Sequence, residues 1–130
     1  MKILLIEDEV KLAGFIQLAL EQAGYVTDHE TDGAVGLQSA MVNNYDLILL
    51  DLKLPQMSGL EFLARLKKDP KLRSIPVVVM TASKSARDVR RALDLHANSY
   101  ILKPLFWRDY VAAIKTIEDF WFGRAESSPK

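Results

Sequence analysis

The sequence contains no cysteine, which excludes disulfide bridges and thiolate metal sites. Its 17 basic and 17 acidic residues give a net charge of zero, so no overall positive field attracts nucleic acid or anionic lipid. No apolar run approaches the roughly 20 residues of a membrane span, and the acids in MKILLIEDE come too early for a signal peptide. We therefore expect a soluble, cytoplasmic protein that binds neither membranes nor, directly, nucleic acid.

Short aliphatic runs alternate with longer segments of helical periodicity. The runs at 3–6, 47–50, 77–80 and 100–102 predict strands covered on both faces, and the more polar stretch 25–29 suits an edge strand. Apolar spacing predicts five helices, at 12–23, from 33 to about 41, at 58–68, at 85–95 and at 107–122. The end signals are Gly24 after the first helix, Asp32 before the second, and the Ser58–Glu61 capping box at the start of the third. This alternation predicts a doubly wound α/β domain with a parallel sheet, covering residues 1–123, and a disordered tail at 124–130.

Polar side chains follow four of the predicted strands. They are Glu7 and Asp8 after the first strand, Asp51 after the third, Thr81 and Ser83 after the fourth, and Lys103 after the fifth. Ligands of open α/β sheets bind at this carboxyl edge. Each residue alone is usually a helix cap or a solvated charge, but gathered carboxylates repel one another unless a cation joins them. The oxygen ligands suit Mg²⁺ or Mn²⁺.

A carboxylate beside a divalent cation, a lysine and a hydroxyl has the parts needed to accept a phosphoryl group. In this hypothesis Asp51 is the phosphoacceptor and Asp8 the main metal ligand, while Glu7 acts directly or through water. Lys103 and Thr81 then stabilise the phosphoryl oxygens.

These residues carry a resemblance to the receiver domain of two-component response regulators. The matching motifs are Glu7-Asp8, Asp51 in DLKLPQMSG, Thr81-Ala82, and Tyr100 with Lys103-Pro104 in SYILKP. The resemblance implies a flavodoxin-like, three-layer fold with five helices around a five-stranded parallel sheet of order 2-1-3-4-5. It also implies a sensor histidine kinase or phosphotransfer protein as the phosphoryl donor.

The same resemblance implies roles for further residues. The backbone carbonyl of Lys53 joins the metal ligands, Thr81 and Tyr100 form the switch, and the peptide before Pro104 is cis. Lys53 and Ser83 occupy the positions that tune hydrolysis of the phosphoryl group. The protein is then a phosphoacceptor switch that catalyses phosphoryl transfer to itself from the donor and its own dephosphorylation, not an enzyme acting on a separate substrate. It signals to a downstream protein through the fourth helix, fifth strand and fifth helix.

Two histidines need separate interpretation. His96 stands where the family commonly has glycine in the turn before the last strand, so we expect this turn to be built differently, with Asn98 adopting a left-handed conformation more easily than His96. We expect His96 to be a surface turn residue and His29 to be part of the second strand.

The fifth predicted helix has an unusually wide apolar face. A helix packed on one sheet needs an apolar stripe only about 100° wide or slightly more. The apolar side chains outside this stripe therefore either close the end of the core or form a homodimer interface. We expect the dimer, through Tyr110, Ile114, Ile117, Phe120 and Trp121. LHANSYILKP with IEDFW is similar to single-domain regulators paired with bacterial phytochrome-type kinases. The basic fourth helix is either a solvated face or a surface for an acidic partner.

Two alternatives remain at this point. The chain could be the receiver fragment of a larger DNA-binding response regulator, since GRAESSPK fits a true terminus or a linker. An aspartyl-phosphate hydrolase is disfavoured, because such enzymes usually place a second Asp two residues beyond the nucleophile and this chain has Lys53 there.

Overall fold

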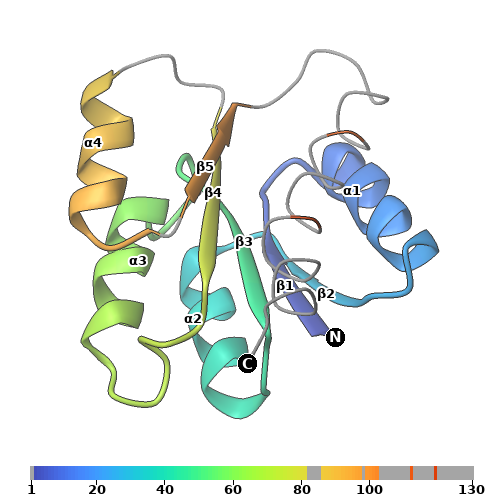
Figure 1. Cartoon of the computed structure of the whole chain (residues 1–130), viewed down its shortest axis with the longest axis horizontal. Helices are drawn as coiled ribbons and strands as arrows, with labels where there is room; N and C mark the ends of the chain where they lie inside the picture. The colour runs from blue at the N-terminus through green and yellow to red at the C-terminus, as the bar shows by residue number, and fades with distance from the viewer. Residues whose placement is uncertain (1, 82–85, 98, 103–111, 113–118, 120–130) are drawn as a thin grey trace.

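The computed structural model describes residues 2–81, 86–97, 99–102, 112 and 119, and Figure 1 shows their arrangement. Strands and helices alternate in the order β1 Lys2–Ile6, α1 Val10–Gln22, β2 Val26–Glu30, α2 Gly33–Val42, β3 Leu47–Asp51, α3 Gly59–Lys68, β4 Val77–Thr81, α4 Ala86–Asp94 and β5 Ser99–Leu102. The five predicted strands and first four predicted helices are confirmed, with ends shifted by a residue or two. The predicted fifth helix and the tail lie outside the described residues. Within the described ranges, no helix combines the length and apolar character needed to cross a bilayer.

The strands form one parallel sheet in the order β2-β1-β3-β4-β5, as the family resemblance implied. The polar strand β2 lies at one edge, as predicted. Helix α1 lies on one side of the sheet and α2, α3 and α4 lie on the other, which gives three layers (Figure 1). Three arginines of α4 are exposed, namely Arg87, Arg90 and Arg91.

Successive residues of each central strand point into two separate hydrophobic clusters, because side chains alternate across a sheet. In β1, Leu4 and Ile6 join the cluster under α2, α3 and α4, whereas Ile3 and Leu5 join the cluster under α1. All four are fully buried. Burial on both faces explains why β1, β3 and β4 have continuous aliphatic runs instead of an alternating pattern. It also makes these strands a rigid support for the residues at their carboxyl ends.

Side-chain caps begin two of the helices where the sequence predicts them. The Asp32 carboxylate accepts a hydrogen bond from the Ala34 N–H at 2.6 Å, and the Ser58 hydroxyl accepts one from the Glu61 N–H at 3.1 Å. The Glu61 carboxylate pairs with Arg65 at 3.1 Å, so the predicted capping box is observed through its serine half. These caps satisfy N–H groups that have no partner inside the helix.

Helices α1 and α4 end in the same hydrogen-bonded motif, and this corrects the prediction for His96. After α1, Gly24 has φ of 97°, and the Tyr25 N–H donates to the Leu20 carbonyl at 3.0 Å. After α4, His96 has φ of 70°, and the Ala97 N–H donates to the Ala92 carbonyl at 3.0 Å. The turn is therefore not built differently. His96 itself takes the left-handed position usual for glycine, because the motif satisfies the last carbonyls of the helix.

Candidate functional site

The acidic residues lie together because β1 and β3 are adjacent and paired with their ends level. Ile6 pairs with Leu50, so Glu7, directly after β1, and Asp51, the last residue of β3, reach the same edge of the sheet. The strand order reverses direction at β1 and β3, because the chain first adds β2 on one side and then β3 on the other. This switch point is where open α/β sheets bind ligands.

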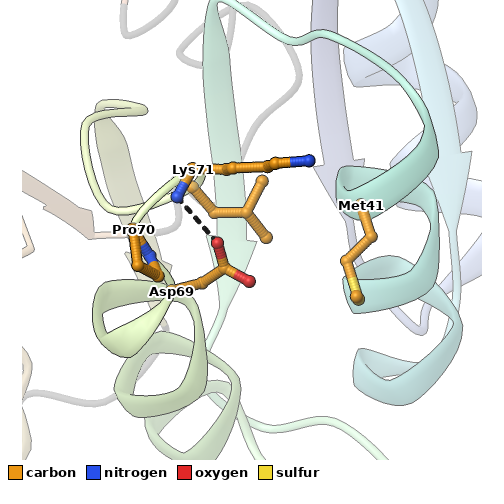
Figure 2. A pocket seen from close by; sticks show the side chains of 5 residues that line it. Met41, Asp69, Pro70 and Lys71 are labelled. Atoms are coloured by element: carbon orange, nitrogen blue, oxygen red, sulfur yellow. Dashed lines mark hydrogen bonds between the residues drawn. The ribbon is translucent and has the colours of Figure 1, made fainter.

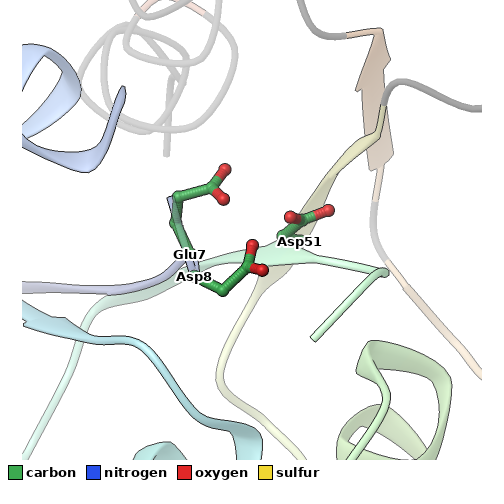
Figure 3. A group of neighbouring side chains, drawn as sticks. All are labelled: Glu7, Asp8 and Asp51. Atoms are coloured by element: carbon green, nitrogen blue, oxygen red, sulfur yellow. The ribbon is translucent and has the colours of Figure 1, made fainter. Parts of the chain in front are cut away.

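Glu7, Asp8 and Asp51 form one cluster of carboxylates. One carboxylate oxygen from each residue can be chosen so that all three atoms lie within 4.8 Å of one another, and Figure 3 shows the groups pointing toward a common space. Glu7 and Asp51 are buried, at 0% and 3% exposure, whereas Asp8 is exposed. The cluster thus has a buried floor and one member open to solvent.

Both buried carboxylates are oriented by the backbone two residues further along. The Glu7 carboxylate accepts a hydrogen bond from the Glu9 N–H at 3.1 Å, and Asp51 accepts one from the Lys53 N–H at 3.2 Å. Among the described residues, the Asp8 carboxylate has no hydrogen-bond or salt-bridge partner. Its place in the cluster therefore depends on the backbone that carries it.

This arrangement fits a hard divalent cation. Three carboxylates concentrate negative charge in a partly buried space, where their repulsion is screened less than in water. Mg²⁺ and Mn²⁺ prefer oxygen ligands, and Mg²⁺ takes few carboxylates while retaining several waters. The exposed Asp8 leaves the cluster open to solvent, from which a hydrated ion can enter. The predicted acids are thus brought together in a form suited to cation-assisted chemistry.

The other predicted site residues are described only in part. Lys53 is exposed after β3, and the role of its carbonyl stays a prediction. Thr81 ends β4, one residue beyond Met80, which pairs with Asp51; its side chain is outside the description. Tyr100, in β5, is 43% exposed. The residues outside the described ranges are Ser83, Lys103, Pro104 and the predicted dimer face Tyr110, Ile114, Ile117, Phe120 and Trp121.

Two residues support the cluster without having been predicted to do so. His29 Nε2 lies 2.8 Å from the Glu7 carbonyl oxygen, and Gly59 donates its N–H to the Leu52 carbonyl at 2.9 Å, beside Asp51. The glycine of the MSG sequence at the start of a predicted helix was a signal for close packing. The contact of His29 depends on the register between β1 and β2, which the sequence does not specify.

A pocket of about 390 Å³ lies elsewhere, between α2 and the segment after α3 (Figure 2). Its lining includes Met41 and Leu72, and the Asp69 carboxylate in its wall accepts a hydrogen bond from the Lys71 N–H at 2.8 Å. The segment after α3 leads into the amino end of β4, opposite the edge that carries Asp51. With one carboxylate and one ammonium group in its lining, this pocket does not match the chemistry of the acidic cluster.

Known proteins are similar to this chain in sequence and in fold. Residues 3–115 match the family model of the response regulator receiver domain. The chain is 41% identical over 116 residues to the response regulator ArlR of Staphylococcus saprophyticus, an alignment covering 89% of this chain and 51% of ArlR. This chain thus spans about half the length of that relative.

Two solved structures are similar over nearly their whole length. The phosphorylated cyanobacterial phytochrome response regulator RcpA has a TM-score of 0.84 and 37% identity, with 92% of both chains covered. The Mn²⁺-bound form of the response regulator Rcp1 has a TM-score of 0.84 and 34% identity, with 98% of this chain and 96% of Rcp1 covered. The expected likeness to phytochrome-associated regulators is therefore present in structure as well as in sequence. Since the family model spans most of the sequence and the sheet order agrees with it, the chain belongs to the receiver domains of response regulators.

Proposed function

We propose that this receiver domain is a phosphorylation-dependent signalling switch whose phosphoacceptor is Asp51. The observation that carries the proposal is the cluster of Glu7, Asp8 and Asp51 at the switch point of the sheet. The donor is a phosphohistidine of a sensor histidine kinase or of a phosphotransfer protein. Membership of the response regulator family and the similarity to phosphorylated RcpA support this donor class.

In the proposed reaction, a carboxylate oxygen of Asp51 attacks the phosphorus atom and forms an acyl phosphate. The bond between phosphorus and the donor imidazole breaks, and the electron pair leaves with the imidazole nitrogen. A bound Mg²⁺ or Mn²⁺ supplies charge neutralisation at the phosphoryl oxygens. Asp8, Asp51 and Glu7 would hold the cation together with the Lys53 carbonyl, and similarity to the Mn²⁺-bound Rcp1 supports a divalent site.

The output of the switch is proposed on the family pattern. Thr81 and Lys103 contact the phosphoryl oxygens, and Tyr100 turns inward as Thr81 moves toward the new group. The 43% exposure of Tyr100 is compatible with an outward starting position. The downstream protein then binds the surface of α4, β5 and the predicted fifth helix, whose aromatic face also forms the proposed homodimer. Lys53 and Ser83 are the proposed determinants of phosphoryl lifetime.

A second arrangement is a receiver that operates within a longer, DNA-binding regulator. The observation in its favour is that the chain spans about half the length of ArlR. The intact mass of the protein isolated from its native cells separates the two arrangements, because a longer regulator gives a mass well above that of 130 residues.

Phosphoryl acceptance is tested with acetyl phosphate and intact mass spectrometry, with and without Mg²⁺. We expect one phosphoryl adduct that requires the cation and disappears in Asp51→Asn. Asp46→Asn is the matched control, because Asp46 lies just before β3, at the opposite end of the strand, where its carboxylate accepts a hydrogen bond from the Lys2 N–H at 2.8 Å. An adduct that persists in Asp51→Asn, or that forms equally without divalent cation, would refute the proposed site.

A further inference from the structure

The end of strand β1 is held by β2 through one backbone bond and one side-chain bond. The Glu7 N–H donates to the Glu30 carbonyl at 3.0 Å, which extends the β1–β2 ladder by one residue beyond the strand. The next polar group along the chain is the Glu7 carbonyl, and its partner is the His29 imidazole at 2.8 Å. His29 pairs with Leu5 in the ladder, so its side chain reaches forward along the sheet to the start of the acidic cluster.

The direction of this bond determines the state of the imidazole. A carbonyl oxygen can only accept, so Nε2 of His29 carries a proton and donates it. The neutral Nε2–H tautomer and the imidazolium both satisfy this requirement. The contact is therefore a structural bond that either form of the imidazole can make.

The three acids of the cluster are held in different ways. Glu7 and Asp51 are buried, and each carboxylate accepts a hydrogen bond from a nearby backbone N–H. Asp8 is exposed, and its carboxylate has no such partner among the described residues. The Asp8 side chain is placed by the Glu7–Asp8 peptide, and the oxygen of that peptide is the atom that His29 holds.

We propose that His29 is a positioning residue for the cation site, which fixes the Glu7–Asp8 peptide and thereby places the Asp8 carboxylate beside Asp51. The inference rests on the proposed cation site and adds to it a residue on a different strand. Without the imidazole, the Glu7 carbonyl bonds to water, and the peptide samples orientations in which Asp8 points away from Asp51. The expected defect is in cation affinity, while the phosphoacceptor itself stays intact.

The test compares His29→Phe, which keeps a ring of similar size but has no N–H donor, with His29→Gln, which keeps a donor. Mn²⁺ binding is measured from the electron paramagnetic resonance signal of the free ion. Partners behind a metal ligand commonly contribute 10- to 100-fold to affinity; since His29 acts through a peptide, we expect His29→Phe to weaken Mn²⁺ binding by about three- to tenfold. We expect His29→Gln to bind within about twofold of the wild-type protein.

The dependence of acetyl phosphate reactivity on Mg²⁺ gives a second readout. His29→Phe should need more Mg²⁺ for half-maximal phosphorylation but reach nearly the wild-type rate when Mg²⁺ is saturating. His96→Gln is the matched control, because His96 is the other histidine of the chain and lies in the turn after α4. It should leave Mn²⁺ binding unchanged.

The outcomes separate this inference from the proposed function. Wild-type affinity in His29→Phe, together with loss of binding in Asp8→Asn, overturns the role of His29 and leaves the cation site standing. Absence of Mn²⁺ binding by the wild-type protein overturns both. Nitrogen NMR of the wild-type imidazole gives a check that needs no variant, since a neutral His29 protonated at Nδ1 would show that the bond to the Glu7 carbonyl does not exist.

Discussion

Replacing Gly59 by alanine should damage the fold and the acidic cluster together, because Gly59 packs directly on the backbone that carries Asp51. A Cβ at this position would overlap the Asp51 carbonyl oxygen and lie 2.6 Å from the Leu52 Cα. Carbon atoms in contact are normally about 3.5–4.0 Å apart, so α3 has to move by about 1 Å from the end of β3. Both obstacles are backbone atoms, which cannot rotate away as the end of a side chain can.

The change in unfolding free energy that we expect for Gly59→Ala is the balance of two opposing effects. Overpacking at a site that cannot relax costs up to about 3 kcal/mol, and alanine in a helix is favoured over glycine by at most about 1 kcal/mol. We expect Gly59→Ala to lower the unfolding free energy by about 2 kcal/mol. Because the movement displaces the carboxyl end of β3, the folded variant should also bind Mn²⁺ more weakly than the wild-type protein.

Gly14→Ala is the matched control, since Gly14 lies in α1 and an added Cβ there meets nothing within 4 Å. It should raise the unfolding free energy by about 0.5–1 kcal/mol through helix propensity alone. Urea unfolding followed by circular dichroism measures both variants. A Gly59→Ala protein as stable as Gly14→Ala would refute the close packing of α3 on the end of β3.

Three further predictions concern the turn after α4, alkaline pH and the cation. His96→Gly should raise the unfolding free energy by about 1 kcal/mol, because glycine adopts the positive φ of 70° without strain; urea unfolding with Gly24→Ala as the opposite change checks this. Burial, and then the hydrogen bond to Asp28 at 2.6 Å, raise the pKa of Tyr45 above its ordinary value of about 10. The folded state therefore holds the Tyr45 phenol proton more tightly than the unfolded state does. The stability gained from this difference should be complete below pH 10 and should be lost as the pH rises above 10. Burial lowers the pKa of Lys67 in the folded state below its ordinary value of 10.5. Between these two pKa values the unfolded state binds the proton more tightly, so Lys67 makes the stability rise with pH, opposite to the effect of Tyr45. Tyr45→Phe should cost about 1 kcal/mol at neutral pH and show a smaller alkaline loss in urea unfolding than the wild-type protein. Saturating Mg²⁺, at 100 times its dissociation constant, should stabilise the wild-type protein by about 2.7 kcal/mol, and thermal unfolding of Asp51→Asn should show little of this effect.

The fold was largely predictable because its strongest signals are local. The aliphatic runs of β1, β3 and β4 are buried on both faces, and the caps at Asp32 and Ser58 begin the expected helices. The prediction for the turn at His96 is wrong because it considers only the low intrinsic preference of histidine for a positive φ. In the structure, the hydrogen bonds closing α4 and the burial of the neighbouring Ala97 outweigh the strain of a positive φ.

The candidate site was predictable in composition but not in its internal differences. The sequence indicated three acids at one edge of the sheet, and the structure brings all three together. It did not indicate that Glu7 is buried while the adjacent Asp8 is exposed, because that depends on how the chain turns after β1. It also did not indicate His29, whose role requires a particular pairing between β1 and β2.

The register of the two central strands explains why the acids meet at all. Each strand carries four consecutive aliphatic residues followed by an acid, ILLIE at 3–7 and LILLD at 47–51. The strands pair with no offset, Ile3 with Leu47 through Ile6 with Leu50, so the two acids are level at the end of the ladder. A shift by one residue would turn the side chains of one strand to the opposite face and separate the carboxylates. The burial of eight aliphatic side chains in this register therefore stabilises the fold and also supplies the force that holds Glu7 and Asp51 together against their mutual repulsion.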